Sequence, residues 1–372
     1  MLNFRAKLRP IRFSLNKSIH IILFLFAFTQ AISGVAQDSL ARKPSIIGYP
    51  IGFYSPETGF GAGLAMAYSF YTVRTDTIAP ASQIQLGLGF TQKNQTIFSL
   101  PFDFYFKERK HQISGEFSYT DFSYDFYGVG DMDNVDEKFE VEFPRFRINY
   151  LKKIRPFVFV GARWWFEKYD LIKIQSGGIL ESGIIEGSSG NVTSGPGVIL
   201  LFDSRDNVYA SAKGHYLELV FHNQDKLWGS DYAYNRYRFD YRFFHSISKR
   251  QTFGFNFFGD FVGGRVPFNQ LPLIGGAKRM RGFYEGRFRD MNLILAQFEY
   301  RKQIFNRWGI NLFMNNAWLA GEPDEFNRTD SHFAAGAGLR YFFDKEKKVH
   351  IRLDAAFSKH KPAFYFTIGE AF

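Results

Sequence analysis

Hydrophobic and polar residues alternate along most of this chain. In YRFDYRF, residues 237–243, aromatic side chains take the odd positions, and Arg238, Asp240 and Arg242 take the even ones. Successive side chains of a β-strand point to opposite faces, so a period of two predicts strands with one apolar and one polar face. A soluble β-sandwich buries the apolar face, whereas a membrane barrel turns it to lipid and keeps the polar face in a wet lumen. Alternation alone leaves both architectures open.

Sixteen segments are predicted as strands on this pattern. An even number allows both ends of a single-chain bacterial barrel to lie on the same side of the membrane. The predicted strands are 46–53, 61–73, 82–92, 96–106, 111–121, 139–150, 155–167, 195–203, 213–223, 232–245, 250–263, 291–303, 308–319, 331–343, 348–358 and 362–371.

One predicted strand shows a change of phase. Phe139 and Val141 share one face, and the apolar residues Phe146 and Ile148 continue on the opposite face. Pro144 lies at the change, and proline within a sheet is confined to edges and bulges. A bulge adds one residue to a strand and so exchanges its faces. We therefore predict a β-bulge at Pro144.

Connections between the predicted strands differ in length and charge. One set is short and mostly basic, comprising 107–110, 151–155, 248–250 and 344–348. The other set includes the long connections 122–138, 168–194, 264–290 and 320–330. Short periplasmic turns and long external loops are typical of outer-membrane barrels. Basic turns at the periplasmic rim can contact anionic lipid headgroups, or they are ordinary solvated turns. The sequence thus favours an all-β fold, a transmembrane antiparallel β-barrel of sixteen strands.

The composition agrees with this fold. The 372 residues include 46 Phe, 20 Tyr and 34 Gly, and no cysteine, so an exported chain would have no disulfide framework. No apolar run after residue 28 approaches the 18 residues or so that a transmembrane helix needs. An aromatic-rich chain without such a helix fits a membrane barrel, and a large exported soluble β-protein is the alternative.

The first 36 residues are predicted to be a signal peptide. Five basic residues and no acidic residue accompany an apolar stretch at 19–28, and the small residues Gly34-Val35-Ala36 follow it. An apolar core of ~10 residues is too short to cross a bilayer of ~30 Å as a helix. Cleavage after Ala36 removes five positive charges and lowers the formal charge from +10 to +5. It leaves 37–45 as a short periplasmic segment before a barrel at 46–372. An uncleaved signal-anchor is the alternative.

No arrangement for catalysis emerges from the residues. The stretch GSSG at 187–190 lacks the spacing of a nucleophile elbow, and the eight histidines have no ligand spacing. The pair Asp203 and Asp206 is compatible with a calcium site, but Arg205 between them favours a self-paired tight turn. Export and barrel patterning argue against a nucleic-acid partner. We expect no enzymatic activity, no cofactor and no metal.

A basic, glycine-rich stretch between two apolar strands, GGAKRMRGFYEGRFRD at 275–290, carries the most specific motif. It contains the tetrad MRGF at 280–283. Other motifs are DSRDN at 203–207 followed by Gly214, GAGLRYFF at 336–343 and IRLDAAF at 351–357. In their order and spacing these motifs resemble the BamA/TamA family of outer-membrane assembly factors, the bacterial surface antigen superfamily.

The resemblance implies that this loop is extracellular, folds back into the barrel and pairs its arginine with acids on the inner wall. Alternation along 291–303 and 308–319 turns Glu299 and Asn315 inward. The implied latch consists of Arg281, Gly282, Phe283, Glu299 and Asn315. Because the family usually has Asp where Asn315 stands, we expect one carboxylate and one amide at Arg281, and hence a weaker latch. An exposed cationic loop is the alternative.

The last predicted strand ends the chain. Phe364, Phe366, Ile368 and Phe372 share one face, and a terminal aromatic residue on such a strand is what outer-membrane insertion machinery reads. Glu370 interrupts this face near the expected membrane interface. An ordinary last strand is the alternative.

The resemblance also implies a function and its partners. Family members assist insertion or translocation of protein or lipid at the Gram-negative outer membrane, through a weak seam that here lies between 46–53 and 362–371. They usually carry periplasmic POTRA domains of ~75 residues, whereas only 37–45 precede the first predicted strand, so a separate partner would have to supply them. We expect contacts with outer-membrane lipids, and with client outer-membrane proteins or a periplasmic partner. A passive or gated pore for small solutes and a membrane anchor for a partner protein are the alternatives. The sequence does not determine the client, the oligomeric state or whether the seam opens.

Overall fold

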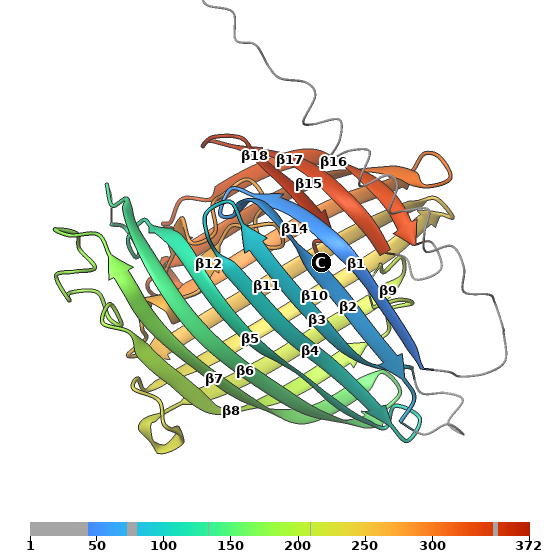
Figure 1. Cartoon of the computed structure of the whole chain (residues 1–372), viewed down its shortest axis with the longest axis horizontal. Helices are drawn as coiled ribbons and strands as arrows, with labels where there is room; N and C mark the ends of the chain where they lie inside the picture. Colours follow the sequence, from blue (N-terminus) through green and yellow to red (C-terminus); the bar gives the residue numbers. More distant parts are fainter. Residues whose placement is uncertain (1–43, 73–79, 133, 209, 345–348) are drawn as a thin grey trace, which may run out of the picture. The chain divides into compact units, whose positions relative to one another are not determined.

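Sixteen strands in the described part of the chain close into one antiparallel barrel (Figure 1). This computed structural model describes residues 44–372 except 73–79, 133, 209 and 345–348. The predicted signal peptide and residues 37–43 lie outside the described residues. Each barrel strand pairs with its neighbours in the sequence, and the last strand pairs with the first. The predicted all-β barrel is therefore confirmed.

The strand bounds differ from the predicted ones mainly at the long-loop end. The barrel strands are β1 (Ser45–Ser55), β2 (Gly59–Phe70), β3 (Ser82–Thr91), β4 (Thr96–Phe106), β5 (His111–Phe126), β6 (Glu137–Arg155), β7 (Val158–Ile174), β8 (Asn191–Asp203), β9 (Gly214–Gln224), β10 (Tyr234–Ser248), β11 (Gln251–Gly264), β14 (Asn292–Gln303), β15 (Trp308–Ala320), β16 (His332–Asp344), β17 (Val349–Ser358) and β18 (Ala363–Ile368). The connections add the short strands β12 (Leu273–Ile274) and β13 (Phe288–Arg289) and the 3-10 helices η1 (Lys226–Trp228), η2 (Phe268–Gln270) and η3 (Pro323–Glu325). None of the described helices is long and apolar enough to cross a bilayer.

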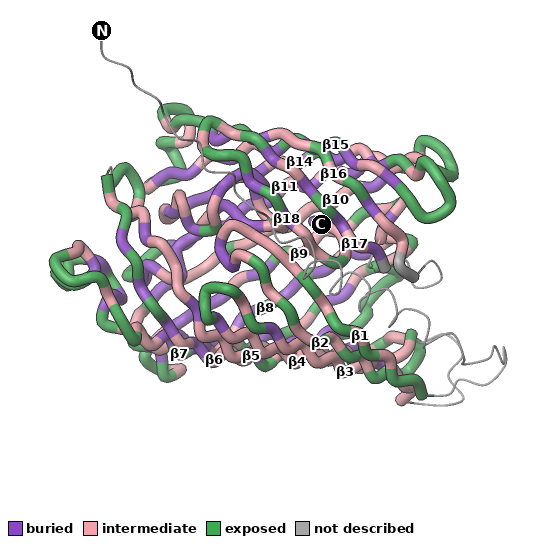
Figure 2. Tube along the Cα trace, turned by 45° about the horizontal axis from the view of Figure 1, so that its top comes forward, coloured by how far each residue is buried: buried purple, intermediate pink, exposed green. Residues whose placement is uncertain are grey.

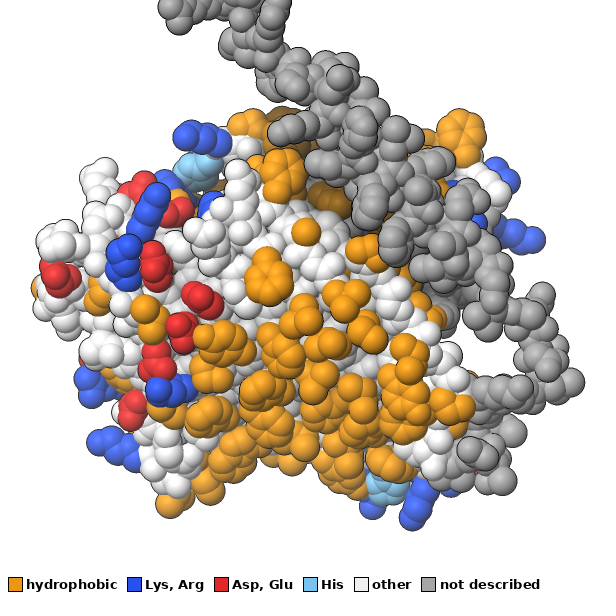
Figure 3. All heavy atoms as spheres, viewed as in Figure 1, with side chains coloured by type: hydrophobic (Ala, Val, Ile, Leu, Met, Phe, Trp, Pro, Cys, Tyr) orange, Lys and Arg blue, Asp and Glu red, His pale blue; other side chains and the backbone are white. Residues whose placement is uncertain are grey.

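The alternation in the sequence becomes an apolar outside and a polar inside. On β15, Leu312 and Met314 are more than half exposed on the outer wall, whereas Asn311 and Asn315 are buried. Hydrophobic side chains gather in a broad band over the wall (Figure 3). Along several strands, exposed residues alternate with buried or partly buried ones, and the turns and loops carry further exposed residues (Figure 2). This is the pattern of strands with lipid on one side and a lumen on the other.

The predicted bulge at Pro144 is wrong. Pro144 pairs with Tyr119 of β5 without any shift in register. The irregularity nearest to Pro144 lies in β7, where Glu140 pairs with Lys173 and the next residue, Val141, pairs with Leu171; a second shift lies near the β6–β7 turn, between Lys153 and Arg155. Ile172 is therefore the extra residue.

The apparent phase change in β6 has a different physical cause. Phe139, Val141 and Phe143 face inward, and their alternation continues with Arg145 and Asn149 on the same face. At the long-loop end, the inner face packs into an apolar core while the outer face is charged. Deeper along the strand, the inner face is polar and the outer face is apolar. The two faces keep their direction and exchange their chemistry, because the strand leaves the lipid near Pro144 and continues above it.

Two apolar cores fill the long-loop half of the barrel. The first packs the connection after β11 against β5, β6 and β7, with Phe268 5.4 Å from Phe126 and 5.7 Å from Phe139 between ring centroids. The second packs Ile274, Met280 and Phe283 of the same connection against β11, β14, β15 and β16. Residues 265–291, which we name the lumen loop, thus act as the internal core of the barrel.

Close backbone approach at Gly161 gives a test of the β6–β7 ladder. A Cβ at Gly161 would lie 1.8 Å from the carbonyl oxygen of Tyr150, and backbone cannot move away without breaking strand pairing. We expect Gly161→Ala to destabilise the barrel by about 1–3 kcal/mol, measured by thermal unfolding in detergent. The control is Gly263→Ala, where no atom lies within 4 Å of the added Cβ. Equal melting temperatures for the two variants would contradict the close approach.

Candidate functional site

The lumen loop turns sharply at Gly282 in the middle of the barrel. Gly282 has φ of 106°, a conformation that disfavours residues with a Cβ. An added Cβ would also lie 2.8 Å from the Cβ of Ala334. The amide of Gly282 donates to the hydroxyl of Tyr365 at 3.0 Å, and the hydroxyl of Ser358 donates to its carbonyl at 2.9 Å. These bonds fix the loop to β17 and to the start of β18.

Arg281 is completely buried and forms two ion pairs. Its Nη2 lies 2.5 Å from Oε2 of Glu299 on β14, and its Nη1 lies 2.8 Å from Oδ2 of Asp354 on β17. The guanidinium carbon also lies 3.6 Å from the ring centroid of Phe313. A buried charge without a partner is costly, so two carboxylates and an aromatic face make this position favourable for an arginine.

The expectation of one carboxylate and one amide at Arg281 is wrong. The side-chain amide of Asn315 donates to the backbone carbonyl of Arg281 at 3.2 Å rather than to its guanidinium. Asp354 supplies the second carboxylate, which sequence reasoning missed. A signal was present, because alternation in IRLDAAF turns Arg352 and Asp354 inward. The expected weakness of the latch therefore has no basis in the charges around Arg281.

Charge pairing continues from Arg281 toward the short-turn end of the barrel. Glu299 also accepts from Arg340, and from the Nε of Arg301 at 2.8 Å. Arg340 Nη1 donates to Glu370 at 2.7 Å. We name this set the latch network, and its charged members are Arg281, Glu299, Arg301, Arg340, Arg352, Asp354 and Glu370. It contains four guanidinium groups and three carboxylates.

Phe283 fills the space beside the latch network. It is 2% exposed and packs against Met280 and the inward side chains of neighbouring strands. Its ring lies 5.9 Å from Phe288 and 5.5 Å from His360 between centroids. Phe283 therefore packs as an apolar plug beside the charged residues, as the resemblance implies.

The end of the chain departs from the predicted last strand. Phe364 and Ile368 are about half exposed on the outer wall, but β18 ends at Ile368 and Gly369 has φ of 85°. The chain turns into the lumen there. Phe372 is 9% exposed, its ring centroid lies 6.2 Å from that of Phe244, and its carbonyl accepts from Arg301 at 3.3 Å. The expected shared face of Phe364, Phe366, Ile368 and Phe372 is therefore wrong for Phe372.

The DSRDN motif forms a tight turn after β8, and its Asp203 also lies 3.6 Å from Arg109 of the β4–β5 turn. Arg205 Nε donates to Oδ1 of Asp203 at 2.9 Å, and a second bond from its Nη2 reaches Oδ2 at 3.2 Å. Oδ1 of Asp206 accepts from the amides of Ala212 and Lys213 at 2.8 and 3.0 Å. Gly214 has φ of 104°, and an added Cβ would lie 2.3 Å from the carbonyl oxygen of Ser204. The geometry matches the self-paired turn expected from the sequence.

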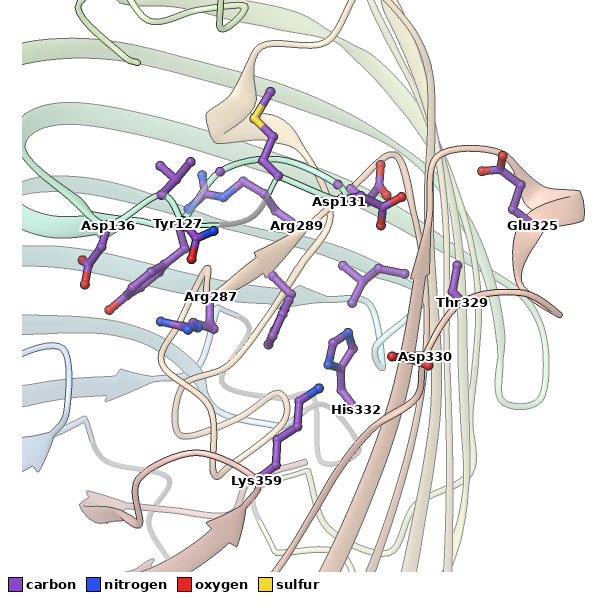
Figure 4. A pocket seen from close by; sticks show the side chains of 18 of the residues that line it. Tyr127, Asp131, Asp136, Arg287, Arg289, Glu325, Thr329, Asp330, His332 and Lys359 are labelled. Carbon is purple, nitrogen blue, oxygen red and sulfur yellow. The ribbon is translucent and has the colours of Figure 1, made fainter. Parts of the chain in front are cut away.

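A polar vestibule of about 900 Å³ lies at the long-loop end (Figure 4). It is lined by residues of the β5–β6 connection, the end of the lumen loop and the β15–β16 connection. Arg287 packs over the ring of Tyr127 at 4.3 Å. Both signs of charge line the vestibule, with Arg287, Arg289 and Lys359 among the cations and Asp131, Asp136 and Asp330 among the anions. This mixture selects no single class of ligand.

The comparison with family models agrees with the barrel and its lumen loop. The model described as the Omp85 superfamily domain matches residues 178–372, more than half of the chain. The chain belongs to the Omp85 superfamily. The lumen loop and every charged member of the latch network lie within the matched residues. Membership indicates a barrel of the Gram-negative outer membrane, so the long-loop end of this Omp85 protein is extracellular and the short-turn end is periplasmic.

Several solved structures share the fold of this chain at low sequence identity. BamA from Haemophilus ducreyi lacking POTRA domains 1–3 is similar with a TM-score of 0.59 and 12% identity, over 88% of this chain and 70% of that one. CdiB from Acinetobacter baumannii gives a TM-score of 0.60 and 10% identity over 89% and 60% of the two chains. CdiB from Escherichia coli gives 0.60 and 11% over 90% and 64%. The Omp85 chain thus spans less than two thirds of either CdiB. No curated protein matches its sequence.

Substitution of Arg281 tests whether the buried pairs hold the lumen loop. Arg281→Ala removes one of the cations paired with Glu299 and with Asp354, which keep only Arg301, Arg340 and Arg352, and it empties the buried space beside Phe313, so we expect a loss of roughly 2–5 kcal/mol in unfolding free energy. Arg287→Ala removes only a contact with Tyr127 and should cost about 1 kcal/mol or less. Thermal unfolding and folding yield in detergent measure both. Equal melting and yield for Arg281→Ala and the parent protein would end the latch hypothesis.

A second pair of variants tests which partner of Arg281 matters. Asp354→Asn keeps the shape of the side chain and removes the charge that faces Arg281 and Arg352, so we expect a loss of several kcal/mol. Asn315→Ala removes one neutral hydrogen bond and should cost about 1 kcal/mol. Chemical unfolding of both variants in one detergent makes the comparison. A larger loss for Asn315→Ala would contradict the charge assignment.

Proposed function

We propose that this Omp85 barrel assists the insertion or translocation of protein or lipid at the outer membrane by opening between β1 and β18. The observation that carries the proposal is the sparse pairing of these two strands. They share one register pair, Tyr54 with Phe366. By contrast, β17 and β18 share six pairs and β1 and β2 share eleven. The seam is therefore the part of the wall with the least strand pairing to break.

The free edge of β1 gives the opening a chemical use. Residues 45–53 pair with β2 on one side and have no register partner in β18 among the described residues. Such an edge presents unpaired backbone donors and acceptors, and an extended segment of another chain can add to it as a strand. A client strand could be held there while it leaves the lumen or enters the membrane.

The lumen loop contacts both sides of the seam. The amide of Glu285 donates to Oε1 of Glu57, in the β1–β2 turn, at 2.8 Å. On the other side, the hydroxyl of Tyr365 on β18 accepts from Gly282 and donates to the carbonyl of Phe283. Opening of the seam would therefore strain or release bonds to the loop, which supports a role for the latch in controlling the seam.

A passive pore is supported less well than this proposal. The lumen loop fills the long-loop half of the barrel with two apolar cores, and the buried pairs of Arg281 lie between the vestibule and the periplasmic end. Solutes would have to displace these buried contacts. A membrane anchor has no distinguishing contact in its favour among the described residues.

Locking the seam tests the proposal. Because the chain has no cysteine, Tyr54→Cys with Phe366→Cys introduces a single pair of thiols at facing positions, where a disulfide can form. We expect the oxidised pair to fail to complement cells depleted of the protein, and reductant to restore function. An inventory of outer-membrane proteins and lipids is the readout. A broad protein deficit indicates assembly, and a loss of lipid asymmetry indicates lipid traffic.

The matched control locks a well-paired part of the wall. Leu312→Cys with Ala337→Cys places thiols at facing positions of β15 and β16, and its oxidised form should complement fully. Full complementation by the oxidised seam pair would overturn the proposal.

A further inference from the structure

A cationic cavity of about 340 Å³ lies at the periplasmic end of the barrel. It is bounded by the β8–β9 turn, the β10–β11 turn, the ends of β14 and β16, and the inward-turned end of the chain. Its charged lining consists of Lys249, Arg250, Arg301, Lys302, Arg340 and Glu370. Arg301 and Arg340 are already paired with Glu299 and Glu370 of the latch network, so Lys249, Arg250 and Lys302 carry the unpaired positive charge of the lining.

The single carboxylate is already occupied. Glu370 accepts from Arg340 at 2.7 Å, and His350 Nε2 lies 2.8 Å from its Oε1. Arg301 and Arg340 are 6% and 3% exposed and form the inner wall of the cavity. The Nε of Arg340 has no hydrogen-bond partner among the described residues. The inner wall therefore includes a buried guanidinium with one N–H group that no described residue accepts from.

The rim of the cavity carries unpaired charge. Lys249, Arg250 and Lys302 are exposed, and within the described residues none of them forms an ion pair. Three cations that lie together repel one another, and an anion between them would relieve the repulsion. The cavity thus has both a buried and an exposed group suited to bind anionic oxygen atoms.

Exposed apolar side chains flank the same rim. Ile247 is 56% exposed, Phe305 is 70% exposed and Trp308 is 49% exposed. Aromatic residues next to lysine and arginine are typical of the boundary between membrane and water. A molecule with an anionic head and an apolar body could place its head in the cavity and its body along Trp308 on the outer wall.

We propose that this cavity binds the phosphate of an anionic phospholipid from the inner leaflet of the outer membrane. The occupant is a lipid rather than an acidic peptide because the apolar contacts lie on the membrane side of the rim, where acyl chains run. Basic pockets at membrane surfaces bind lipid headgroups through the same combination of charge and depth. Lipid binding here goes beyond the proposed function, since it does not require the seam to open.

The test compares two triple variants of the full chain, purified in detergent and stripped of lipid. The cavity variant carries Lys249→Ala, Arg250→Ala and Lys302→Ala. The control variant carries Lys152→Ala, Lys153→Ala and Arg155→Ala at another exposed, basic periplasmic turn that also has apolar neighbours, Ile154 and Phe157. Native mass spectrometry measures binding of phosphatidylglycerol and of phosphatidylcholine to each.

We expect the parent and the control variant to prefer phosphatidylglycerol, and the cavity variant to lose at least about tenfold in affinity for it, because each cation near a membrane surface contributes roughly 1 kcal/mol. Should the triple variant fold poorly, Lys302→Ala alone should lose about fivefold by the same reasoning. Equal losses in the cavity and control variants would overturn the proposal, because rim charge in general would then explain binding.

Two further arms separate the source of the anion. Inorganic phosphate that binds the parent as tightly as phosphatidylglycerol does would overturn the lipid assignment in favour of a free phosphate. Hexaglutamate that binds the parent but not the cavity variant, while phosphatidylglycerol does not bind, would overturn it in favour of an acidic peptide. We expect inorganic phosphate and hexaglutamate each to displace phosphatidylglycerol from the parent only weakly.

Discussion

One buried positive charge constrains the interior of this barrel. The guanidinium of Arg281 is buried away from water. It is stable there only while the carboxylates of Glu299 and Asp354 both pair with it. Three separate segments must therefore agree: the loop must turn at Gly282, and β14 and β17 must each have the register that directs a carboxylate inward. Because these three conditions must hold together, the lumen loop has one defined position inside the barrel. This interdependence also makes the loop a structural part of the barrel interior.

The alternation of apolar and polar residues explains which features of the structure could be predicted from the sequence. Sixteen strands, and the inward direction of Glu299, follow from a period of two within single segments. Asp354 was missed as a partner of Arg281 because their meeting depends on how β14 and β17, which are not neighbours, curve around the lumen. The predicted bulge at Pro144 was wrong because two different events give the same sequence pattern. Apolar residues shift to the opposite face either when a bulge exchanges the faces or when the strand passes from lipid to water. The inward turn at Gly369 requires a backbone conformation that alternation does not encode.

The seam and the latch are better understood together than apart. β1 and β18 share little backbone pairing, yet the loop bonds to the turn beside β1 and to Tyr365 on β18. Side-chain and loop contacts inside the barrel thus supplement what the sheet lacks at this one place. A barrel closed in this way can be stable and still open between β1 and β18, because a few side-chain and loop bonds are easier to break than a continuous ladder of backbone hydrogen bonds.

The extension of β5, β6 and β7 above the lipid has a consequence for what the cell shows to its surroundings. The outer face of β6 carries Lys138, Glu140 and Glu142 there, and the inner faces of the three strands pack into an aromatic core. An antibody would therefore contact charged side chains held on β-strands rather than on a loop. The arrangement of these charges would then depend on interior packing, and a core substitution could change antibody binding without altering any exposed residue.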